Sequence, residues 1–424
     1  MILFLWKGLI RDPSRSLFPV ITVSVGVMLT VVLHNWIAGL EGELVKASAR
    51  FTTGHLKVTT RAYALEEDQF PNDLALLGVD SLVRDLRQRY PGLLWSPRIR
   101  FGGLIDIPDT AGETRDQGPA VGFAVDLLGR ETSEVRTLNL GQAIARGRLP
   151  ARKGEALLSD EFAAKLGVGI GETATLVGAT RHGSLATANF VVAGTVRFGI
   201  TMLDRGTIIA DIEDIREALD MSDAAGEVLG YFPDELYRDD EASGIAADFH
   251  RLLPDTAGEF APVMVTLRNQ AGLGQTLDVW SYLTGVLLLV FILVMSIVLW
   301  NAGLMAGLRR YGEVGLRLAM GEPKGRIYRA MLGESVMIGI LGSALGTVLG
   351  LGVSFYLQET GIDVGSMMKN ASIMLANVLR ARVTPSSYVI GFVPGLTATL
   401  LGSSIAGIGI YRRQTAQLTK ELQS

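Results

Sequence analysis

The residues best suited to chemistry are few and scattered. The 424-residue chain has no cysteine and only four histidines, His34, His55, His182 and His250, which lie far apart in the sequence. The lack of cysteine excludes disulfides, iron–sulfur clusters and thiolate metal sites. The GxxxxGK[ST], HExxH and GxSxG motifs are also missing. We therefore expect no catalytic residue, metal site or cofactor in this chain, with His55 on a strand surface and His34 at a membrane interface.

Charged residues of a different kind stand between two long apolar runs. Arg309, Glu313 and Arg317 repeat every four residues, a spacing that allows weak ion pairs along one helix face. Gly321 and Pro323 then end the helix. The pattern fits either a solvated basic loop or a helix on which a cytoplasmic motor subunit docks.

Glu334 lies at the start of the next apolar run. An ionisable group at membrane depth is a functional candidate by default. Its closeness to the end of the run also allows a structural role, in which it pairs with Arg326 or Arg329. Both interpretations remain open.

The apolar runs themselves predict an α-helical membrane protein. Hydrophobic residues make up 48% of the chain and charged residues 19%. Runs at 17–40, 277–305, 331–357 and 388–411 each reach the roughly 20 residues that a bilayer-spanning helix needs. Gly342, Gly346 and Gly350 recur every four residues, so we expect spans three and four to form a closely packed rigid block, with bulkier faces on spans one and two.

The charge distribution predicts which segments face the cytoplasm. Segments 1–16, 306–330 and 412–424 together hold twelve basic and four acidic residues. Short, positively charged segments stay on the cytoplasmic side. Residues 1–16 are expected to form an amphipathic interfacial helix, 306–330 a cytoplasmic helix and 412–424 a tail. Residues 41–276 and the loop 358–387 then lie outside the inner membrane.

The large outer segment, 41–276, has the patterns of a mixed α+β domain. It holds 24 basic and 35 acidic residues, a net charge of −11, which argues against nucleic-acid binding. Alternating apolar residues predict strands at 54–60, 156–158, 173–179, 189–196 and 206–211. Helical patterns cover 79–90, 160–167 and 211–220, where Asp211 or Asp214 is a candidate N-cap. A β-rich insertion is expected at about 105–205.

The order of these parts resembles that of the MacB/FtsX class of ABC permeases. "RRYGEVGLRLAMGEPKGRIYRAMLGES", at 309–335, is similar to the class pattern between spans two and three. "GRLPARKGEALLSDEFAAKLGVGIGETATL" and "FVVAGTVRFGITMLDRGTIIADIEDIREAL" resemble stretches of MacB-like periplasmic domains, and "TGHLKV" resembles the LolC/LolE-like lipoprotein-releasing permeases. The resemblance implies a type VII ABC permease architecture, with four transmembrane helices and a periplasmic domain.

That resemblance also implies how the chain works. ATP and Mg²⁺ would be bound by a separate ABC ATPase subunit dimer, which docks on the cytoplasmic helix. The residues carried over as ATPase-coupling candidates are Arg309, Arg310, Glu313, Val314, Arg317, Met320 and Gly321. Glu322-Pro323, where the class more usually has a small residue, and Met320 depart from the pattern, which leaves the identity of the docking partner open.

Class members act as dimers, so the resemblance implies a second permease copy or a paralogue. Spans one and two would then lie near the dimer centre. Val32, Leu33, Leu289 and Leu293 are candidates for lining a cavity that receives acyl chains, with core packing as the alternative. The expected task is to extract lipoprotein or lipid from the membrane, or to export a periplasmic substrate, and a periplasmic acceptor is a further candidate partner. The alternatives are an FtsX-like mechanotransmitter that regulates a cell-wall hydrolase, and a sensor that signals to a histidine kinase.

Overall fold

The structure is a computed structural model that describes residues 13–129, 133–252, 258–270, 272–309, 316–317, 320–364 and 378–412. The chain divides into two compact units. The helical unit comprises Met1–Gly42, Leu277–Ile362 and Leu379–Ser424, and the sheet unit comprises Glu43–Thr276 and Asp363–Val378. The predicted interfacial helix at 1–16 and tail at 412–424 lie almost entirely outside the described residues.

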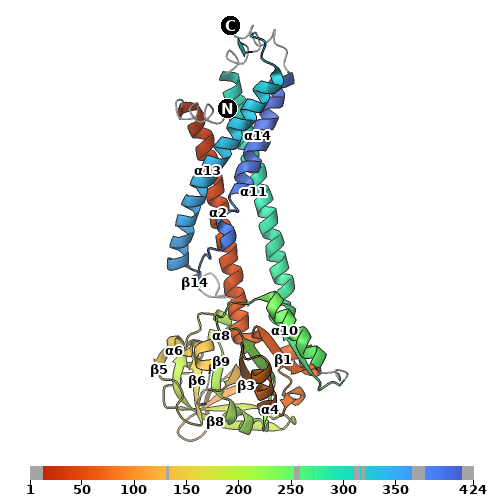
Figure 1. The fold of residues 1–424 in the computed structure, drawn as a ribbon. Coiled ribbons are helices and arrows are strands. Elements are labelled where there is room, and N and C mark those ends of the chain that lie inside the picture. The colour runs from red at the N-terminus through yellow and green to blue at the C-terminus, as the bar shows by residue number, and fades with distance from the viewer. Residues whose placement is uncertain are drawn as a thin grey trace. The chain divides into compact units, whose positions relative to one another are not determined.

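Long apolar helices dominate the helical unit (Figure 1). They are α2 (Pro13–Ser48), α11 (Leu273–Arg309), α13 (Lys324–Thr360) and α14 (Phe392–Arg412). Within the described residues, four helices are long and apolar enough to cross a membrane, which confirms the predicted class. Helix α2 has 36 residues, or about 54 Å, against a hydrocarbon core of about 30 Å. Helices α2 and α11 each cross the boundary between the two units.

Short elements connect α13 to α14. Strand β13 (Ile362–Asp363) pairs with β14 (Val378–Leu379), and the 3-10 helix η5 (Pro385–Tyr388) precedes α14. A capping box fixes the start of η5. The hydroxyl of Thr384 accepts the backbone amide of Ser387, and the hydroxyl of Ser387 accepts the backbone amide of Thr384.

A row of glycines brings α13 against α2. The glycines Gly342, Gly346 and Gly350 face Val23, Val27 and Val31 of α2. A Cβ atom on Gly346 would lie 2.5 Å from the carbonyl oxygen of Ser24, so a larger residue cannot approach as closely. Helix α14 packs on the same helices, with Gly395 against the side chain of Ser343. The close packing predicted for spans three and four thus also includes span one, because α2 presents a valine row at matching four-residue spacing.

Ten strands of the sheet unit form one mixed sheet. Its order is β12-β1-β11-β3-β4-β9-β6-β8-β5, and β7 pairs with both β3 and β8. The strands are β1 (Leu56–Thr60), β3 (Leu94–Pro108), β4 (Thr114–Val125), β5 (Ile144–Gly147), β6 (Glu155–Ser159), β7 (Thr173–Ala179), β8 (Leu185–Val196), β9 (Thr207–Asp211), β11 (Glu227–Tyr231) and β12 (Pro262–Thr266). A separate pair joins β2 (Leu76–Leu77) to β10 (Ala224–Ala225).

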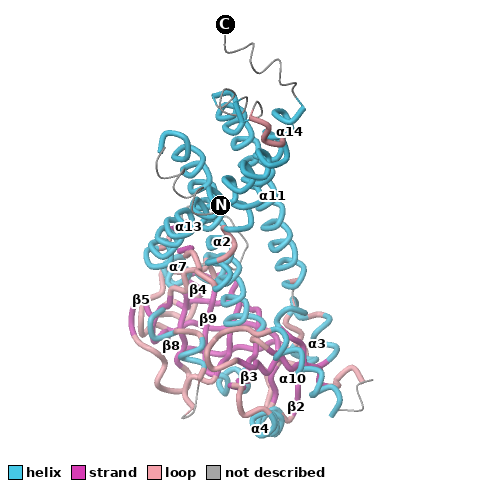
Figure 2. The backbone as a smooth tube through the Cα atoms, turned by 45° about the horizontal axis from the view of Figure 1, so that its top comes forward, coloured by secondary structure: helices cyan, strands magenta, loops and turns pink. Residues whose placement is uncertain are grey.

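Part of this sheet closes on itself. Because β7 joins β8 back to β3, the strands β3, β4, β9, β6, β8 and β7 form a closed ring, drawn in magenta with the other strands in Figure 2. The 15-residue strand β3 is shared, since its first half pairs with β11 and its second half with β4. The ring takes strands from Leu94 to Asp211, a wider range than the β-rich insertion expected at 105–205.

Short helices cover the strands of the sheet unit. They are α3 (Arg61–Leu65), α4 (Val79–Arg89), α5 (Glu134–Thr137), α6 (Leu140–Ala143), α7 (Asp160–Lys165), α8 (Thr201–Asp204), α9 (Ile212–Ala218) and α10 (Asp239–Leu252), with the turns η2 (Glu67–Gln69), η3 (Asn72–Leu74) and η4 (Leu267–Asn269). The π-helix η1 (Ala49–Thr53) directly follows α2. The main apolar core lies between the sheet and residues of α4 and α10.

Most local elements predicted from the sequence are confirmed, including β6, β7, β9, α4 and α9. Asp211 is the N-cap of α9, because its carboxylate accepts the amide of Glu213. The prediction for His55 is wrong. This residue is buried, and its Nδ1 accepts the amide of Phe232 at 2.9 Å. The reason is tertiary packing, because the ring of His55 lies against the rings of Tyr231, Phe232 and Tyr237, which come from a distant part of the chain.

Candidate functional site

The predicted coupling residues lie only partly within the described structure. Arg309 is the last residue of α11, although its side chain is not described. Arg310, Glu313 and Val314 lie outside the described residues. The remaining three, Arg317, Met320 and Gly321, are described, and they lie just before α13.

A tight turn forms at these three residues. The amide of Met320 donates to the carbonyl of Leu316 at 2.9 Å, and the amide of Glu322 donates to the carbonyl of Arg317 at 3.0 Å. Gly321 has a φ of +88°, a conformation that glycine adopts readily at the end of a helical turn. Met320 is 72% exposed and Leu316 63% exposed. The turn therefore presents two largely exposed apolar side chains.

The four candidate cavity residues lie on two helices. Val32 and Leu33 of α2 are half-buried, whereas Leu289 and Leu293 of α11 are 54% and 52% exposed. Helix α11 reaches the other helices near Met295, whose side chain occupies the space over Gly26 of α2. Large apolar side chains elsewhere along α11 are exposed on several faces, so this helix offers surface to lipid or to another chain. A cavity lined by the four residues stays a prediction.

Glu334 is half-buried in α13. The neighbouring Ser335 donates its hydroxyl to Ser403 of α14 at 2.6 Å. Arg329, one of its two predicted partners, donates from Nε to the carbonyl of Gly325 in its own helix. The pairing of Glu334 with Arg326 or Arg329 stays a prediction.

Asn35 is a polar junction that the sequence reasoning missed. It is fully buried in α2, and its Nδ2 donates to Ser354 Oγ of α13 at 2.9 Å. Its Oδ1 accepts the hydroxyl of Ser387 in η5, and its carbonyl accepts the amide of Arg382 at 2.9 Å. One residue thus ties α2 to α13 and to the segment before α14. An asparagine within an otherwise apolar run was the available signal.

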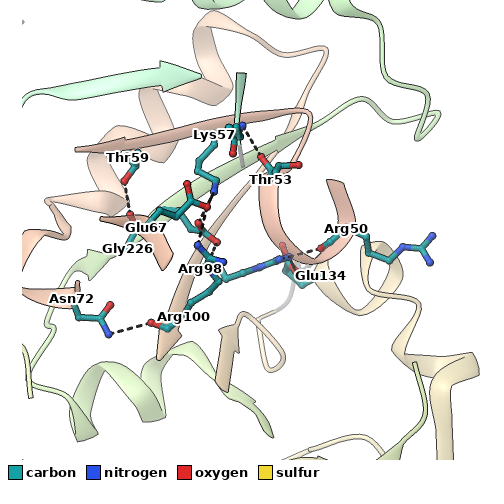
Figure 3. A network of polar contacts seen from close by, with 12 residues as sticks. Arg50, Thr53, Lys57, Thr59, Glu67, Asn72, Arg98, Arg100, Glu134 and Gly226 are labelled. Atoms are coloured by element: carbon teal, nitrogen blue, oxygen red, sulfur yellow. Dashed lines mark hydrogen bonds and ion pairs between the residues drawn. The ribbon is translucent and has the colours of Figure 1, made fainter. Parts of the chain in front are cut away.

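A second polar junction lies in the sheet unit (Figure 3). Arg98 of β3 is completely buried, and its Nη2 donates to Glu134 at 2.9 Å and to the hydroxyl of Tyr231 at 3.1 Å. Its Nη1 donates to the backbone carbonyl of Arg50 at 3.1 Å. Arg50 belongs to η1, the π-helix that continues α2. Arg98 therefore fixes the end of this long helix to β3 and to α5.

Further buried charges extend this junction across three strands. Lys57 of β1 pairs with Glu227 of β11 at 3.2 Å and with Glu67 at 2.5 Å. Arg100 pairs with Glu67 at 2.9 Å. These side chains share one face of the sheet, while Val58, Ile99 and Val228 on the other face belong to the apolar core.

The electrostatics of the junction favour the ionised forms of Arg98 and Glu227. Burial alone would lower the pKa of Arg98, but the negative charges of Glu134 and Glu227 raise it. Burial alone would raise the pKa of Glu227, but the charges of Arg100 and Lys57 hold it below its ordinary value. The cluster is thus a set of paired charges without a free acid or base. Among the residues that the structure describes, no three His, Cys, Asp or Glu side chains are grouped to hold a metal ion.

Comparison with known proteins identifies the helical unit. Residues 285–415 match the family model described as FtsX-like permease C-terminal. This range begins within α11 and ends past α14, so it covers both apolar helices that follow the predicted coupling loop.

Two curated relatives extend the likeness. Over 236 residues the chain is 24% identical to the lipoprotein-releasing system transmembrane protein LolC of Xylella fastidiosa, a match that covers 53% of this chain and 54% of LolC. Over 102 residues it is 33% identical to the macrolide export ATP-binding/permease protein MacB of Wolinella succinogenes, covering 23% of this chain and 16% of MacB. The match thus spans about half of LolC and a smaller part of MacB.

Among solved structures, the periplasmic region of MacB from Actinobacillus actinomycetemcomitans aligns with a TM-score of 0.36 and 9% identity. The alignment covers 53% of this chain and 94% of that region. The family match and the two relatives confirm the resemblance found in the sequence: residues 285–415 match the FtsX-like permease C-terminal family model, and the chain is similar to LolC and MacB.

Proposed function

Because residues 285–415 carry an FtsX-like permease domain, we propose that the chain is the membrane-spanning subunit of an ABC transporter of the FtsX, MacB and LolC type. It acts without catalysis of its own. A separate ATPase dimer binds ATP and Mg²⁺ and docks on the segment 306–330. The exposed Leu316 and Met320 beside the Gly321 turn are the described surface that supports this docking site.

One observation carries the proposal that the chain relays motion. Helices α2 and α11 each continue from the helical unit into residues of the sheet unit without a break. A continuous helix transmits displacement along its axis because its hydrogen bonds lie along that axis. The buried Arg98, which binds the end of α2, gives the relay a firm attachment in the sheet unit.

The proposed orientation rests on charge. The positively charged segments 1–16, 306–330 and 412–424 lie in the cytoplasm, and the acidic sheet unit lies outside the inner membrane. In this orientation ATP hydrolysis inside the cell moves a folded body outside it.

The proposed substrate is a lipoprotein or lipid taken from the membrane, for delivery to a periplasmic acceptor. LolC, which shares 24% identity with this chain, is named for lipoprotein release. A second permease copy or a paralogue completes the transporter, and the exposed apolar faces of α11 are surface that such a partner could cover. Leu289 and Leu293 belong to this exposed surface, which favours them as contacts for acyl chains or for the partner.

The experiment that tests this function is copurification of the intact, tagged chain from its native membrane. We expect an ABC ATPase and acylated protein or lipid among the bound components. Recovery of a cell-wall hydrolase would favour the FtsX-like mechanotransmitter, and recovery of a histidine kinase would favour the sensor. Absence of any ATPase would contradict the proposal.

A charge reversal tests the docking site within that experiment. Glu313→Lys combined with Arg317→Glu should abolish ATPase recovery, because both changes fall in the predicted coupling helix. The control is Arg84→Gln with Arg89→Gln on α4 of the sheet unit, whose side chains are also exposed. Retained ATPase binding by the charge-reversed chain would refute the docking assignment.

A further inference from the structure

The segment 379–388 lies against residues 35–42 of α2 and exposes two arginines. Burial alternates along it, with Leu379 and Ala381 buried and Arg380 and Arg382 exposed. In an extended chain this alternation directs both arginines to the same side, with Cα atoms roughly 6–7 Å apart. The two guanidinium groups therefore form a pair on one surface of the helical unit.

The backbone beneath these arginines is held firmly in place. The amide of Arg382 donates to the carbonyl of Asn35 at 2.9 Å, and the amide of Val383 donates to Gln358 Oε1 at 2.9 Å. A Cβ atom on Gly39 of α2 would lie 1.9 Å from the carbonyl oxygen of Arg380, so the segment crosses α2 at a site that only glycine permits. The arginines thus extend from a fixed support.

None of the salt bridges given for the described residues joins Arg380 or Arg382 to a carboxylate. The loop 358–387 contains Lys369 and these two arginines against Glu359 and Asp363, a net positive charge. A basic loop on this side is unusual, because short positive segments normally face the cytoplasm. An anion on this surface would explain the departure.

Aromatic residues mark the depth of the arginine pair. Tyr356 near the end of α13 and Tyr388 at the end of η5 are exposed, and Trp36 of α2 is half-buried. Tyrosine and tryptophan favour the headgroup level of a bilayer. The guanidinium group of Arg382 lies beside Gly42 of α2, six residues after Trp36, and a Cβ atom on Gly42 would lie 3.1 Å from its Nη1. We therefore expect Arg382 at the level of the lipid phosphates.

We propose that Arg380 and Arg382 bind the phosphate of a phospholipid headgroup at this end of the membrane helices. Guanidinium groups are planar forks that bind phosphate oxygens in pairs, and they are more weakly hydrated than the ammonium group of lysine. In the orientation proposed above, the lipid belongs to the outer leaflet. This binding does not depend on the ATPase or on the transported substrate.

The test uses the full chain with a single reporter. Because the sequence has no cysteine, Tyr388→Cys can be labelled with one environment-sensitive fluorophore next to the pair. The labelled protein in neutral detergent is titrated with phosphatidylglycerol. In this background Arg380→Gln with Arg382→Gln should weaken binding roughly 25-fold, about fivefold for each positive charge removed. Diacylglycerol, which lacks the phosphate, should give no saturable signal.

A matched control lies at the other end of the helical unit. Arg326→Gln with Arg329→Gln removes the same charge near the start of α13 and should leave the response of the fluorophore unchanged. The proposal would be overturned if the Arg380/Arg382 variant bound phosphatidylglycerol as tightly as the labelled chain that keeps both arginines. Equal losses in both double variants, or an equal response to diacylglycerol, would also overturn it. The titration contains no ATPase, so its outcome is independent of the copurification that tests the proposed function.

Discussion

The helical unit and the sheet unit bury polar groups in different ways. In the helical unit the buried junction is neutral, with Asn35 bonded to Ser354 and Ser387. In the sheet unit the buried junction is charged, with Arg98 and Lys57 paired to glutamates. Both junctions hold the same long helix. The neutral junction lies within the apolar run of α2, and the charged junction binds the π-helix η1 that continues α2.

The difference follows from the solvent around each unit. A charge within a bilayer is expensive, whereas a neutral side-chain hydrogen bond between membrane helices contributes only about 0.6–1.7 kcal/mol. In a water-soluble domain a buried charge is tolerated when it is paired, but removal of one partner costs about 3–5 kcal/mol. The charged junction should therefore fix its helix end more strictly than the neutral one.

The largest expected effect is at Arg98. Arg98→Met keeps most of the side-chain volume but leaves Glu134 buried without its cation. We expect the free energy of unfolding to fall by about 3–5 kcal/mol. Chemical denaturation of the full chain, followed by tryptophan fluorescence, measures the loss.

Two controls sharpen this result. Adding Glu134→Gln to Arg98→Met should recover part of the loss, because no buried charge then lacks a partner. Arg115→Met breaks an exposed pair with Glu172 and should cost far less, since water screens such pairs. Equal losses in Arg98→Met and Arg115→Met would contradict the idea that burial makes the junction strong.

His55 gives the sheet unit a dependence of its stability on pH. Burial lowers the pKa of His55 to about 4, from an ordinary value of 6.5. The unfolded chain therefore binds a proton more readily between these values, so stability is full above pH 6.5 and falls as the pH drops toward 4. The slope from this residue is at most about 1.4 kcal/mol per pH unit.

The variant His55→Asn keeps an acceptor near the amide of Phe232 but cannot titrate. Thermal unfolding from pH 7 to pH 4 should show a shallower loss of stability in this variant than in the natural chain. Superimposable pH profiles would mean that His55 is accessible to protons in the folded state.

The glycine row of α13 provides the next effect. In Gly346→Leu the new Cβ atom would lie 2.5 Å from the carbonyl oxygen of Ser24. Because this distance is too short, α2 and α13 must separate. We expect a loss of about 1–3 kcal/mol. Gly352→Leu, where a Cβ meets no atom within 4 Å, has the same gain in helix propensity without the clash. A similar thermal stability of the two variants in detergent would show that α2 does not pack on this row.

Local patterns predicted much of the fold because they depend on neighbouring residues. Apolar length revealed α2, α11, α13 and α14, and alternation revealed β7 and β9. The closed ring was beyond such reasoning, since it depends on β7 pairing with both β3 and β8, which lie far apart in the sequence. His55 was placed wrongly for the same reason, because the aromatic rings that bury it, those of Tyr231, Phe232 and Tyr237, are distant in the sequence.

The candidate site was less predictable than the fold. Gly321 was identified because a turn that requires glycine leaves a local signal. The glycine row was recognised, but its partner was not, because four-residue spacing on α13 matches either α14 or the valine row of α2. Arg98 and Glu134 gave no signal, since their pairing across 36 residues arises only when β3 and α5 come together.

The smallest expected effect is at Asn35, and it tests the comparison most directly. Asn35→Leu fits the apolar run but removes the acceptor of Ser387 and the donor to Ser354. Ser354 still donates to the carbonyl of Gly350, and Ser387 still contacts Thr384, so neither hydroxyl is left without a partner. We therefore expect a loss of only about 0.6–1.7 kcal/mol. A double-mutant cycle of Asn35→Leu with Ser387→Ala, measured by thermal unfolding in detergent, isolates the hydrogen bond between Asn35 and Ser387. A coupling energy as large as that between Arg98 and Glu134 would contradict the comparison. It would show that the neutral junction stabilises its helix as much as the buried charges do.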